Sequence, residues 1–301
     1  MMKQLFLSLA LALSATAFAQ VLEVQSVTPL QLKDAGRSVV TGISPKGDYV
    51  LLSDAQLNGL ARYDLATGRI SVISQARSAG LNATISPDGA SVAFREDSFK
   101  EGLRYTDVSV HTFATGATKQ LLRGARNVNA VSLQGNTAVT IANGEAKKMA
   151  LEGKAVKNAA PVAAIVNRQL VLTVNGKSEI ISPLGTDRSY LWPSVSPSGH
   201  HICFYVAGTG CFISDLKGKI VARLGKLRAA KWLNSTTVVG MNDTDDGHVV
   251  TASSIVAATI DGKSQVLTDA SLKAMYPYPA AAGKMIVFTT DEGDNYIINI
   301  K

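Results

Sequence analysis

The ionisable residues of this chain are numerous, but few have the spacing that a metal site requires. The four histidines are His111, His200, His201 and His248. His200 and His201 are adjacent at the start of an expected strand, where successive side chains point to opposite faces, so they should not bind one metal together. A structural or catalytic zinc ion needs three or four converging ligands. The histidines therefore predict no metal centre.

Nucleophile and phosphate-binding motifs are also missing from the sequence. The chain contains no Gly-x-Ser-x-Gly segment, which forms the nucleophile elbow of serine hydrolases. Two Gly-Lys-Ser triplets, at residues 176–178 and 262–264, have the ending of a P-loop, but Val171 and Ala257 stand where its first glycine belongs. Both triplets lie among expected strands, so we interpret them as hairpin turns.

Two acidic runs were compared with a calcium-binding loop. In the run that begins at Asn242, the sixth position is Gly247 as required, but the third is Thr244 and the twelfth is Ser253 rather than glutamate. The second run covers residues 291–294. We expect both to be solvated loops and expect no cofactor, with weak calcium binding at these acidic loops as the alternative.

The N-terminus predicts export. Residues 1–3 are a short basic start, residues 5–13 are apolar, and Ala17-Phe18-Ala19 before Gln20 fits a small-x-small cleavage site. We expect residues 1–19 to be a cleavable signal peptide and residues 20–301 to form one domain, periplasmic or secreted. No cysteine lies near the cleavage point to carry a lipid anchor, and no later apolar run is long enough to span a membrane.

The charge of the chain limits the class of partner. The formal net charge is +7 at pH 7, and the basic residues are scattered among acids rather than grouped. An exported chain without a basic stripe is not expected to bind nucleic acid. Attraction to an anionic glycan, to lipid headgroups or to an acidic partner stays open beside the simpler interpretation of a solvated basic surface.

The two cysteines, Cys203 and Cys211, flank an expected hairpin turn. If that turn centres on Gly208-Thr209, Cys211 faces Val206 and Cys203 faces Ser214, so the thiols are out of register for a disulfide. We therefore expect two buried free thiols.

A repeated tight turn indicates how the chain folds. Ser-Pro-x-Gly occurs at residues 44–47, 86–89 and 196–199, each time just before a short apolar strand. Proline pre-sets the second turn position and glycine takes the positive-φ position that closes the hairpin. A hairpin that recurs at intervals of tens of residues is typical of a repeat fold. The short, turn-bounded strands identify this repeat as the blade of a β-propeller.

Counting the repeats predicts the number of blades. Seven hairpins join a first to a second strand, but only six turns join a third to a fourth strand. The alternating segment at residues 21–27 can supply the missing outer strand of the last blade and close the ring. We therefore expect an all-β propeller of seven four-stranded antiparallel blades. The fourth blade, residues 162–192, lacks a clear outer strand, so six blades with an irregular insertion is the alternative.

The Ser-Pro-Asp-Gly turn followed by an apolar strand resembles the WD40-like (PD40) repeats of TolB-type propellers and of prolyl oligopeptidase and dipeptidyl-peptidase relatives. The resemblance covers nearly all of the mature chain and implies a fold rather than a chemistry. We expect neither the α/β domain that precedes the propeller of TolB nor a peptidase domain. The histidines also do not match those that propeller lyases acting on oligogalacturonate gather around a metal.

The geometry of a blade predicts where a partner would bind. Because the strands are antiparallel, the first–second and third–fourth turns share one face, and the longer loops gather on the opposite face, where function usually lies. Aromatic and arginine residues on such loops are typical contact anchors. Our candidate binding residues are Arg188, Tyr190, Trp192, Arg228, Asp243, Asp246, His248, Tyr276 and Tyr278.

The sequence leads to one main hypothesis and one alternative. The main hypothesis is a monomeric, non-enzymatic exported propeller that binds a protein, cell-envelope or glycan ligand through its long-loop face. The alternative is a carbohydrate-active enzyme, a glycan lyase or hydrolase, that uses loop carboxylates such as Asp97, Asp243 and Asp246. Two carboxylates about 5 to 9.5 Å apart could act as acid and base, so a converging pair would favour the enzyme. For Trp192, ligand contact and packing between blades stay equally open.

Overall fold

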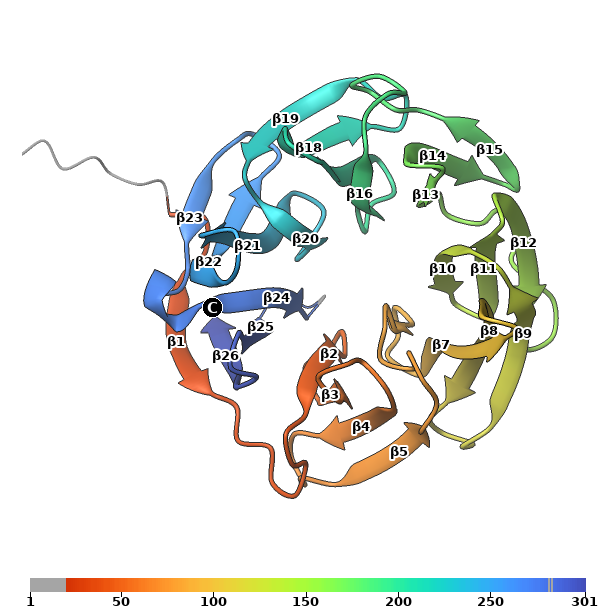
Figure 1. Cartoon of the computed structure of the whole chain (residues 1–301), viewed down its shortest axis with the longest axis horizontal. Helices are drawn as coiled ribbons and strands as arrows, with labels where there is room; N and C mark the ends of the chain where they lie inside the picture. Colours follow the sequence, from red (N-terminus) through yellow and green to blue (C-terminus); the bar gives the residue numbers. More distant parts are fainter. Residues whose placement is uncertain (1–19, 281, 283) are drawn as a thin grey trace, which may run out of the picture.

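The structure, a computed structural model, describes residues 20–280, 282 and 284–301. In these residues, seven antiparallel sheets stand around an open centre, as Figure 1 shows. The expected all-β propeller with seven blades is confirmed, and the six-blade alternative is not. The expected signal peptide lies outside the described residues. The helical content of the described part is a single turn, η1 (Ala270–Leu272), and nothing in that part is a helix able to cross a membrane.

Five blades have four strands, numbered outward from the opening in chain order. Blade 1 contains β2 (Val39–Ile43), β3 (Tyr49–Ser53), β4 (Leu60–Asp64) and β5 (Ile70–Ser74). Blade 2 contains β6 (Thr84–Ile85), β7 (Ser91–Lys100), β8 (Leu103–Thr112) and β9 (Thr118–Ala125). Blade 5 contains β16 (Tyr190–Val195), β17 (His201–Val206), β18 (Gly210–Asp215) and β19 (Ile220–Gly225). Blade 6 contains β20 (Arg228–Trp232), β21 (Thr237–Asp245), β22 (Val250–Thr259) and β23 (Ser264–Val266).

The last blade is built from both ends of the chain. Blade 7 contains β24 (Ala274–Pro279), β25 (Met285–Thr290) and β26 (Asn295–Ile300), and β1 (Val24–Pro29) pairs antiparallel with β26 as its outer strand. Gln265 of β23 fixes the segment before β1, because its Oε1 accepts the N–H groups of Val21 and Leu22 at 2.7 and 2.8 Å. The expected closure of the ring by an N-terminal strand is confirmed, and it removes an exposed sheet edge.

The three Ser-Pro-x-Gly segments form the expected turns. In each, the glycine N–H donates to the serine carbonyl at 2.8–3.0 Å, and the glycine has a positive φ of 72–75°. The buried serine side chain adds a second bond, since the N–H of Ser91 donates to Ser86 Oγ at 2.9 Å. These turns end the inner strands of their blades. We call the face that carries them the short-turn face and the opposite one the long-loop face.

Seven clusters of buried side chains, one between each pair of adjacent blades, form the core. Between blades 4 and 5, for example, Leu170 and Leu172 pack with Ile202 and Phe204. Successive side chains of a strand point to opposite faces, and the second strands are buried almost continuously, as in β3 and β25, so both faces of such a strand meet a neighbouring blade. The ring is therefore held by contacts between the faces of successive sheets.

Blades 3 and 4 have three strands each. Because blade 3 lacks a fourth strand, the chain runs through blade 4 in the opposite direction. Blade 3 contains β10 (Val128–Gln134), β11 (Thr137–Ala142) and β12 (Glu145–Ala150), and blade 4 contains β13 (Val162–Val166), β14 (Gln169–Val174) and β15 (Lys177–Ile180). Near the start of β10, Asn129 Nδ2 donates to the carbonyl of Ile165 near the end of β13 (2.9 Å). At the end of β10, Gln134 Oε1 accepts the N–H of Ala160, just before β13 (2.6 Å). The inner strands of these two blades are therefore antiparallel.

The three strands of blade 4 return the chain to its earlier direction. The N–H of Tyr190, at the start of β16, donates to the carbonyl of Arg168 in the hairpin after β13 (2.9 Å). Arg168 thus lies on the long-loop face. The sequence-based assignment of this hairpin to the short-turn face is wrong, because it assumed an outer strand in blade 3. Residues 151–161 instead lead back toward the centre without pairing in a sheet.

Cys203 and Cys211 are buried and free, as expected. Their register differs from the expected one, because the loop has three residues: Val206 pairs with Gly210, and Tyr205 pairs with Cys211. This change of one residue brings both side chains to the same face of the sheet, and their Sγ atoms lie 3.6 Å apart. The expectation that the thiols are out of register is corrected.

Candidate functional site

Two hairpins extend the long-loop face beyond the rest of the ring. The β7–β8 hairpin pairs continuously to Lys100 and Leu103, and the β21–β22 hairpin pairs to Asp245 and Val250. Figure 1 places β7 and β21 on opposite sides of the opening. Their tips carry exposed apolar side chains, Phe99, Leu103 and Val249, each about half exposed or more. Apolar side chains at solvated tips are a feature of interaction surfaces.

A bulge recurs in the inner strands near the opening. The pairing register shifts after Leu191, Arg228 and Met275, and the next residue has a positive φ in each case. These residues are Trp192 (48°), Ala229 (50°) and Tyr276 (49°), and Asn82 (54°) holds the same place before β6. A positive φ is unfavourable for bulky side chains. Trp192 and Tyr276 nevertheless take it, and both are followed by proline.

The bulge in β20 positions Arg228 for contact with Asp243 and Trp192. Arg228 Nη1 donates to Asp243 Oδ2 at 2.5 Å, and its Cζ lies 5.7 Å from the centre of the Trp192 ring. The Asp243 side chain is 2% exposed, whereas that of Arg228 is 35% exposed. A buried carboxylate paired with a planar guanidinium fixes the direction of the remaining N–H groups. Among the described residues, this guanidinium donates a single hydrogen bond to protein, from Nη1 to Asp243. Its other N–H groups are therefore available to a ligand at the surface.

Lys231, three residues further along β20, bridges blades 6 and 7. Its Nζ atom donates to the carbonyl of Pro277 at 3.1 Å and lies 3.9 Å from the centre of the Tyr278 ring. The amine is enclosed by protein, and this desolvation lowers the pKa of Lys231 to about 8. Burial also raises the pKa of Tyr278 to about 12, with a smaller contribution from Tyr276. The half-buried Tyr278 side chain is thus a packing partner of Lys231.

The other candidate residues lie apart from this cluster. Tyr190 is buried in the core, where its hydroxyl donates to the carbonyl of Gly185. Arg188 is exposed and pairs with Asp187 at 3.9 Å. Asp246 and His248 are exposed in the tip of the β21–β22 hairpin. Hydrogen bonds from the N–H groups of Val249 and His248 lower the pKa of Asp246, so its carboxylate stabilises the hairpin turn.

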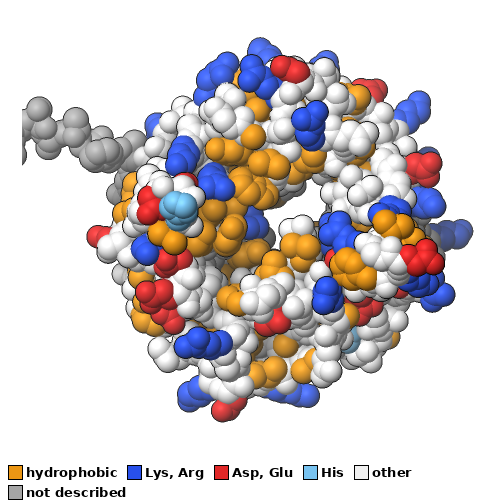
Figure 2. Space-filling model, in the orientation of Figure 1, with side chains coloured by type: hydrophobic (Ala, Val, Ile, Leu, Met, Phe, Trp, Pro, Cys, Tyr) orange, Lys and Arg blue, Asp and Glu red, His pale blue; other side chains and the backbone are white. Residues whose placement is uncertain are grey.

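Every blade contributes a basic side chain to the loops of the long-loop face that adjoin the inner strands. We call these residues the basic ring: Arg37, Arg77, Arg126, Arg168, Arg188, Arg228 and Lys273. Figure 2 shows Lys and Arg side chains at several points around the opening. The candidate binding residues from the sequence include Arg188 and Arg228 and leave out the other five members. Arg37 and Lys273 have the same signal as Arg126 and Arg188, a basic residue directly before an inner strand. Arg168 was not recognised because blade 4 is reversed.

The three carboxylates of the enzyme alternative do not form one cluster. Asp97, in β7, accepts hydrogen bonds from Ser78 and Thr106 and lies 3.9 Å from Arg104. Asp243 and Asp246 are in blade 6, across the opening from Asp97 (Figure 1). In the part of the chain that the structure describes, no three His, Cys, Asp or Glu side chains gather closely enough to hold a metal ion.

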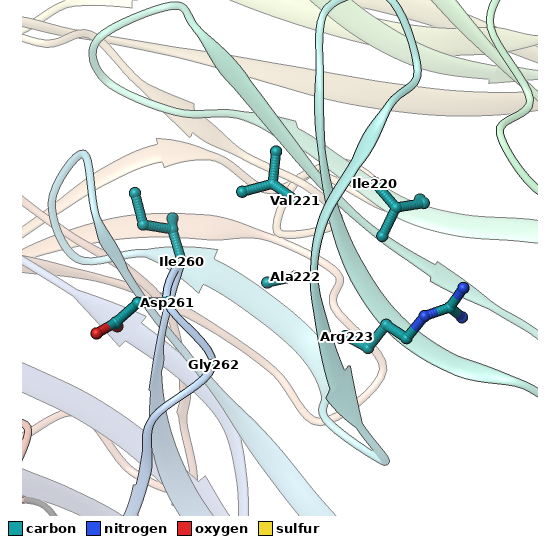
Figure 3. A pocket seen from close by; sticks show the side chains of 7 residues that line it. All are labelled: Ile220, Val221, Ala222, Arg223, Ile260, Asp261 and Gly262. Carbon is teal, nitrogen blue, oxygen red and sulfur yellow. The ribbon is translucent and has the colours of Figure 1, made fainter.

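A groove lies elsewhere, at the outer side of blades 5 and 6. It has a volume of about 470 Å³ and is lined by residues 220–223 and 260–262. In Figure 3 the Arg223 guanidinium and the Asp261 carboxylate point away from each other. Their partners are Phe212, under the guanidinium, and Lys263, paired with Asp261 at 2.9 Å. This groove offers no converging polar groups of the kind that small-molecule sites use.

Comparisons with known proteins support the fold. No protein-family model and no curated protein sequence matches this chain. A solved oligogalacturonate lyase in complex with manganese is 15% identical, with a TM-score of 0.51, over 86% of this chain and 76% of that chain. TolB from Acinetobacter baumannii is 14% identical, with a TM-score of 0.50, over 79% of this chain and 55% of its own. These likenesses show the fold alone.

A third solved structure is the β-propeller domain of the Trilobed protease from Pyrococcus furiosus, which is described as having an open velcro topology. It is 14% identical, with a TM-score of 0.56, over 85% of this chain and 92% of that chain. The present ring differs from that description, because β1 pairs with β26. The likeness to TolB and to this domain agrees, at the level of the fold, with the repeat pattern in the sequence.

Proposed function

We propose that this protein is an exported, non-enzymatic propeller that binds a partner protein through its long-loop face. The observation that carries the proposal is the basic ring, which places one Arg or Lys of each blade on this face. The exposed rings of Trp192 and Tyr276 and the apolar hairpin tips lie on the same face. Trp, Tyr and Arg are the residue types that dominate binding energy in protein interfaces.

A glycan ligand with catalysis is the second candidate, because an oligogalacturonate lyase shares the fold. We favour binding, since Asp97 and Asp243 belong to blades on opposite sides of the opening and each is held by protein partners (Figure 1). An assay separates the two. Release of unsaturated products from oligogalacturonate, abolished in Asp243→Asn or Asp97→Asn, would support the enzyme.

Site-specific cross-linking tests the binding proposal. A cysteine replaces Asp246, at the exposed hairpin tip of the long-loop face, and carries a photo-cross-linker with a cleavable arm. The matched control replaces Lys217, equally exposed in the turn between β18 and β19 on the short-turn face. The two native thiols are buried and should not react with the reagent.

We expect one discrete protein adduct from the Asp246→Cys protein in an envelope extract of the source cells and none from the Lys217→Cys control. The adduct protein is then identified by mass spectrometry and purified for a direct binding measurement with the wild-type chain. Adducts that form only from the short-turn face would overturn the proposal, and so would a purified adduct protein that does not bind.

A further inference from the structure

Acidic and basic residues occupy partly different loops of the long-loop face. The basic ring lies in the loops that lead into the inner strands. One group of acids lies on the hairpins between second and third strands, which are farther from the axis because the inner strand is nearest to it. These exposed outer acids are Asp54, Glu101, Asp245, Asp246, Asp291, Glu292 and Asp294. Three further exposed acids lie in the loops of the basic ring itself, Asp34, Asp187 and Asp269, and Lys273 of the ring pairs with Asp291 at 3.0 Å. A broad acidic surface would meet this outer acidic circle, whereas a narrow acidic segment could reach the basic ring.

The aromatic residues of the bulges are not explained by the bulges themselves. Asn82 and Ala229 take the same backbone conformation without an aromatic ring. Asparagine is the residue that tolerates a positive φ best after glycine. Trp192 and Tyr276 are strained at these positions and are nevertheless 38% and 48% exposed, respectively. Strained residues that the fold does not require cluster at functional sites.

Arg228 connects these two observations. It begins β20, the inner strand between those that carry Trp192 and Tyr276, and it belongs to the basic ring. Asp243 holds its guanidinium from the buried side, and the Trp192 ring lies beside it at 5.7 Å. Asp243 Oδ1 is buried and has no hydrogen-bond partner among the described residues. The acidic group of a ligand thus finds an oriented cation beside the exposed Trp192 ring, and Tyr276 holds the equivalent place on the next inner strand.

We propose that the opening on the long-loop face binds an extended acidic segment of a partner protein. The carboxylates of that segment pair with the basic ring, and an apolar side chain packs on Trp192 and Tyr276 beside Arg228. The proposal rests on the binding function proposed above and names the chemistry of the partner. Both properties of the occupant follow from the site. The basic ring calls for net negative charge, and the exposed side chains of Trp192 and Tyr276 call for an apolar anchor.

Selection from a displayed library of random 12-residue peptides on the immobilised protein tests this. We expect selected peptides to be rich in Asp and Glu, to contain an aromatic or large aliphatic residue, and to lose affinity as salt is raised. The synthesised peptides are then measured by fluorescence anisotropy. Trp192→Asn and Tyr276→Asn should each weaken binding about tenfold or more, as expected for anchor residues.

Thermal unfolding of the same variants separates contact from packing. Since Asn relieves the positive-φ strain, we expect melting midpoints within about 4 °C of wild type, while binding falls. Arg77→Gln with Arg126→Gln should weaken binding and flatten its salt dependence. The matched control, Lys46→Gln with Lys217→Gln on the short-turn face, should leave both unchanged.

The outcomes distinguish this inference from the function on which it depends. Peptides without acidic enrichment, or binding that survives Trp192→Asn and Tyr276→Asn, overturn the acidic-segment proposal alone. Binding that is lost only in the short-turn control overturns the long-loop binding function as well. If no peptide is selected but a fluorescently labelled uronate-containing oligosaccharide binds directly by anisotropy, the occupant is a glycan and the peptide assignment is wrong.

Discussion

A side chain at Gly240 would collide with the backbone carbonyl of Arg228. A Cβ built at Gly240 stands 2.8 Å from that oxygen and 2.8 Å from Leu227 Cγ, closer than real Cβ contacts. The approach arises because the bulge at Ala229 presses β20 against β21. Gly240 therefore allows the bulge that positions Arg228.

We expect Gly240→Ala to destabilise the protein by about 1–3 kcal/mol, the usual cost of overpacking, and to weaken ligand binding by displacing Arg228. Chemical denaturation measures the first effect. Because Leu227 is itself part of the core, Leu227→Ala also destabilises, so a double-mutant cycle is needed. The cycle should show that removing the Leu227 side chain offsets only part of the cost of Gly240→Ala, since the backbone clash remains. If Gly240→Ala cost nothing in the Leu227→Ala background, the carbonyl contact would be unimportant.

Asn295 joins the last blade to the first. Its Nδ2 donates to the carbonyl of Ser38 (2.7 Å), and its Oδ1 accepts the N–H of Val40 (2.9 Å). Asn295→Ala leaves these buried backbone groups without partners, so we expect a loss of about 2–4 kcal/mol in the free energy of unfolding. Asn299→Ala, which removes one half-buried bond to Ser26 Oγ, should cost about 1 kcal/mol or less. Equal effects of the two changes would contradict this role in closure.

Lys231 should titrate well below other lysines. Desolvation lowers its pKa to about 8, which NMR of the ¹³C-dimethylated protein can measure, with Lys231→Arg assigning the signal. The Tyr278 ring favours the charged amine, so Tyr278→Leu should lower the pKa further. A signal for Lys231 that titrates with the exposed lysines would refute the enclosure of the amine.

The same shift has a consequence for stability. The folded pKa lies below the unfolded value of about 10.4, so between pH 8 and about 10 the unfolded chain binds more protons than the folded one. The free energy of unfolding should rise with pH in this window through Lys231. Denaturation of wild type and Lys231→Met across the window measures this contribution, which the variant should lack.

The two thiols should be unreactive in the folded protein. Hydrogen bonding with Cys211 and burial raise the pKa of the Cys203 thiol, so little thiolate is present, and both side chains are about 1% exposed. Iodoacetamide should modify neither residue in the native state and both in urea without reductant. Fewer than two modified cysteines in urea would reveal a disulfide instead.

The fold was predictable because its strongest signals are local. Turn chemistry in Ser-Pro-x-Gly is determined within four residues, and the unpaired last strand required a partner from the N-terminus. The site was less predictable. The spacing of Arg228 and Asp243 in the sequence does not predict an ion pair. The bulges that expose Trp192 and Tyr276 arise from pairing with neighbouring strands, which local sequence does not show. Tyr190 fails as a contact residue for the same reason, since its ring turns into the core.

The direction of blade 4 could not be found from local patterns, because it depends on a count. Each missing strand reverses the chain, so a single three-stranded blade would send every later long loop to the wrong face. It would also leave the N-terminal strand unable to pair antiparallel with β26. This architecture can therefore gain or lose outer strands only in even numbers. An engineer who restored the fourth strand of blade 3 would have to restore that of blade 4 in the same step.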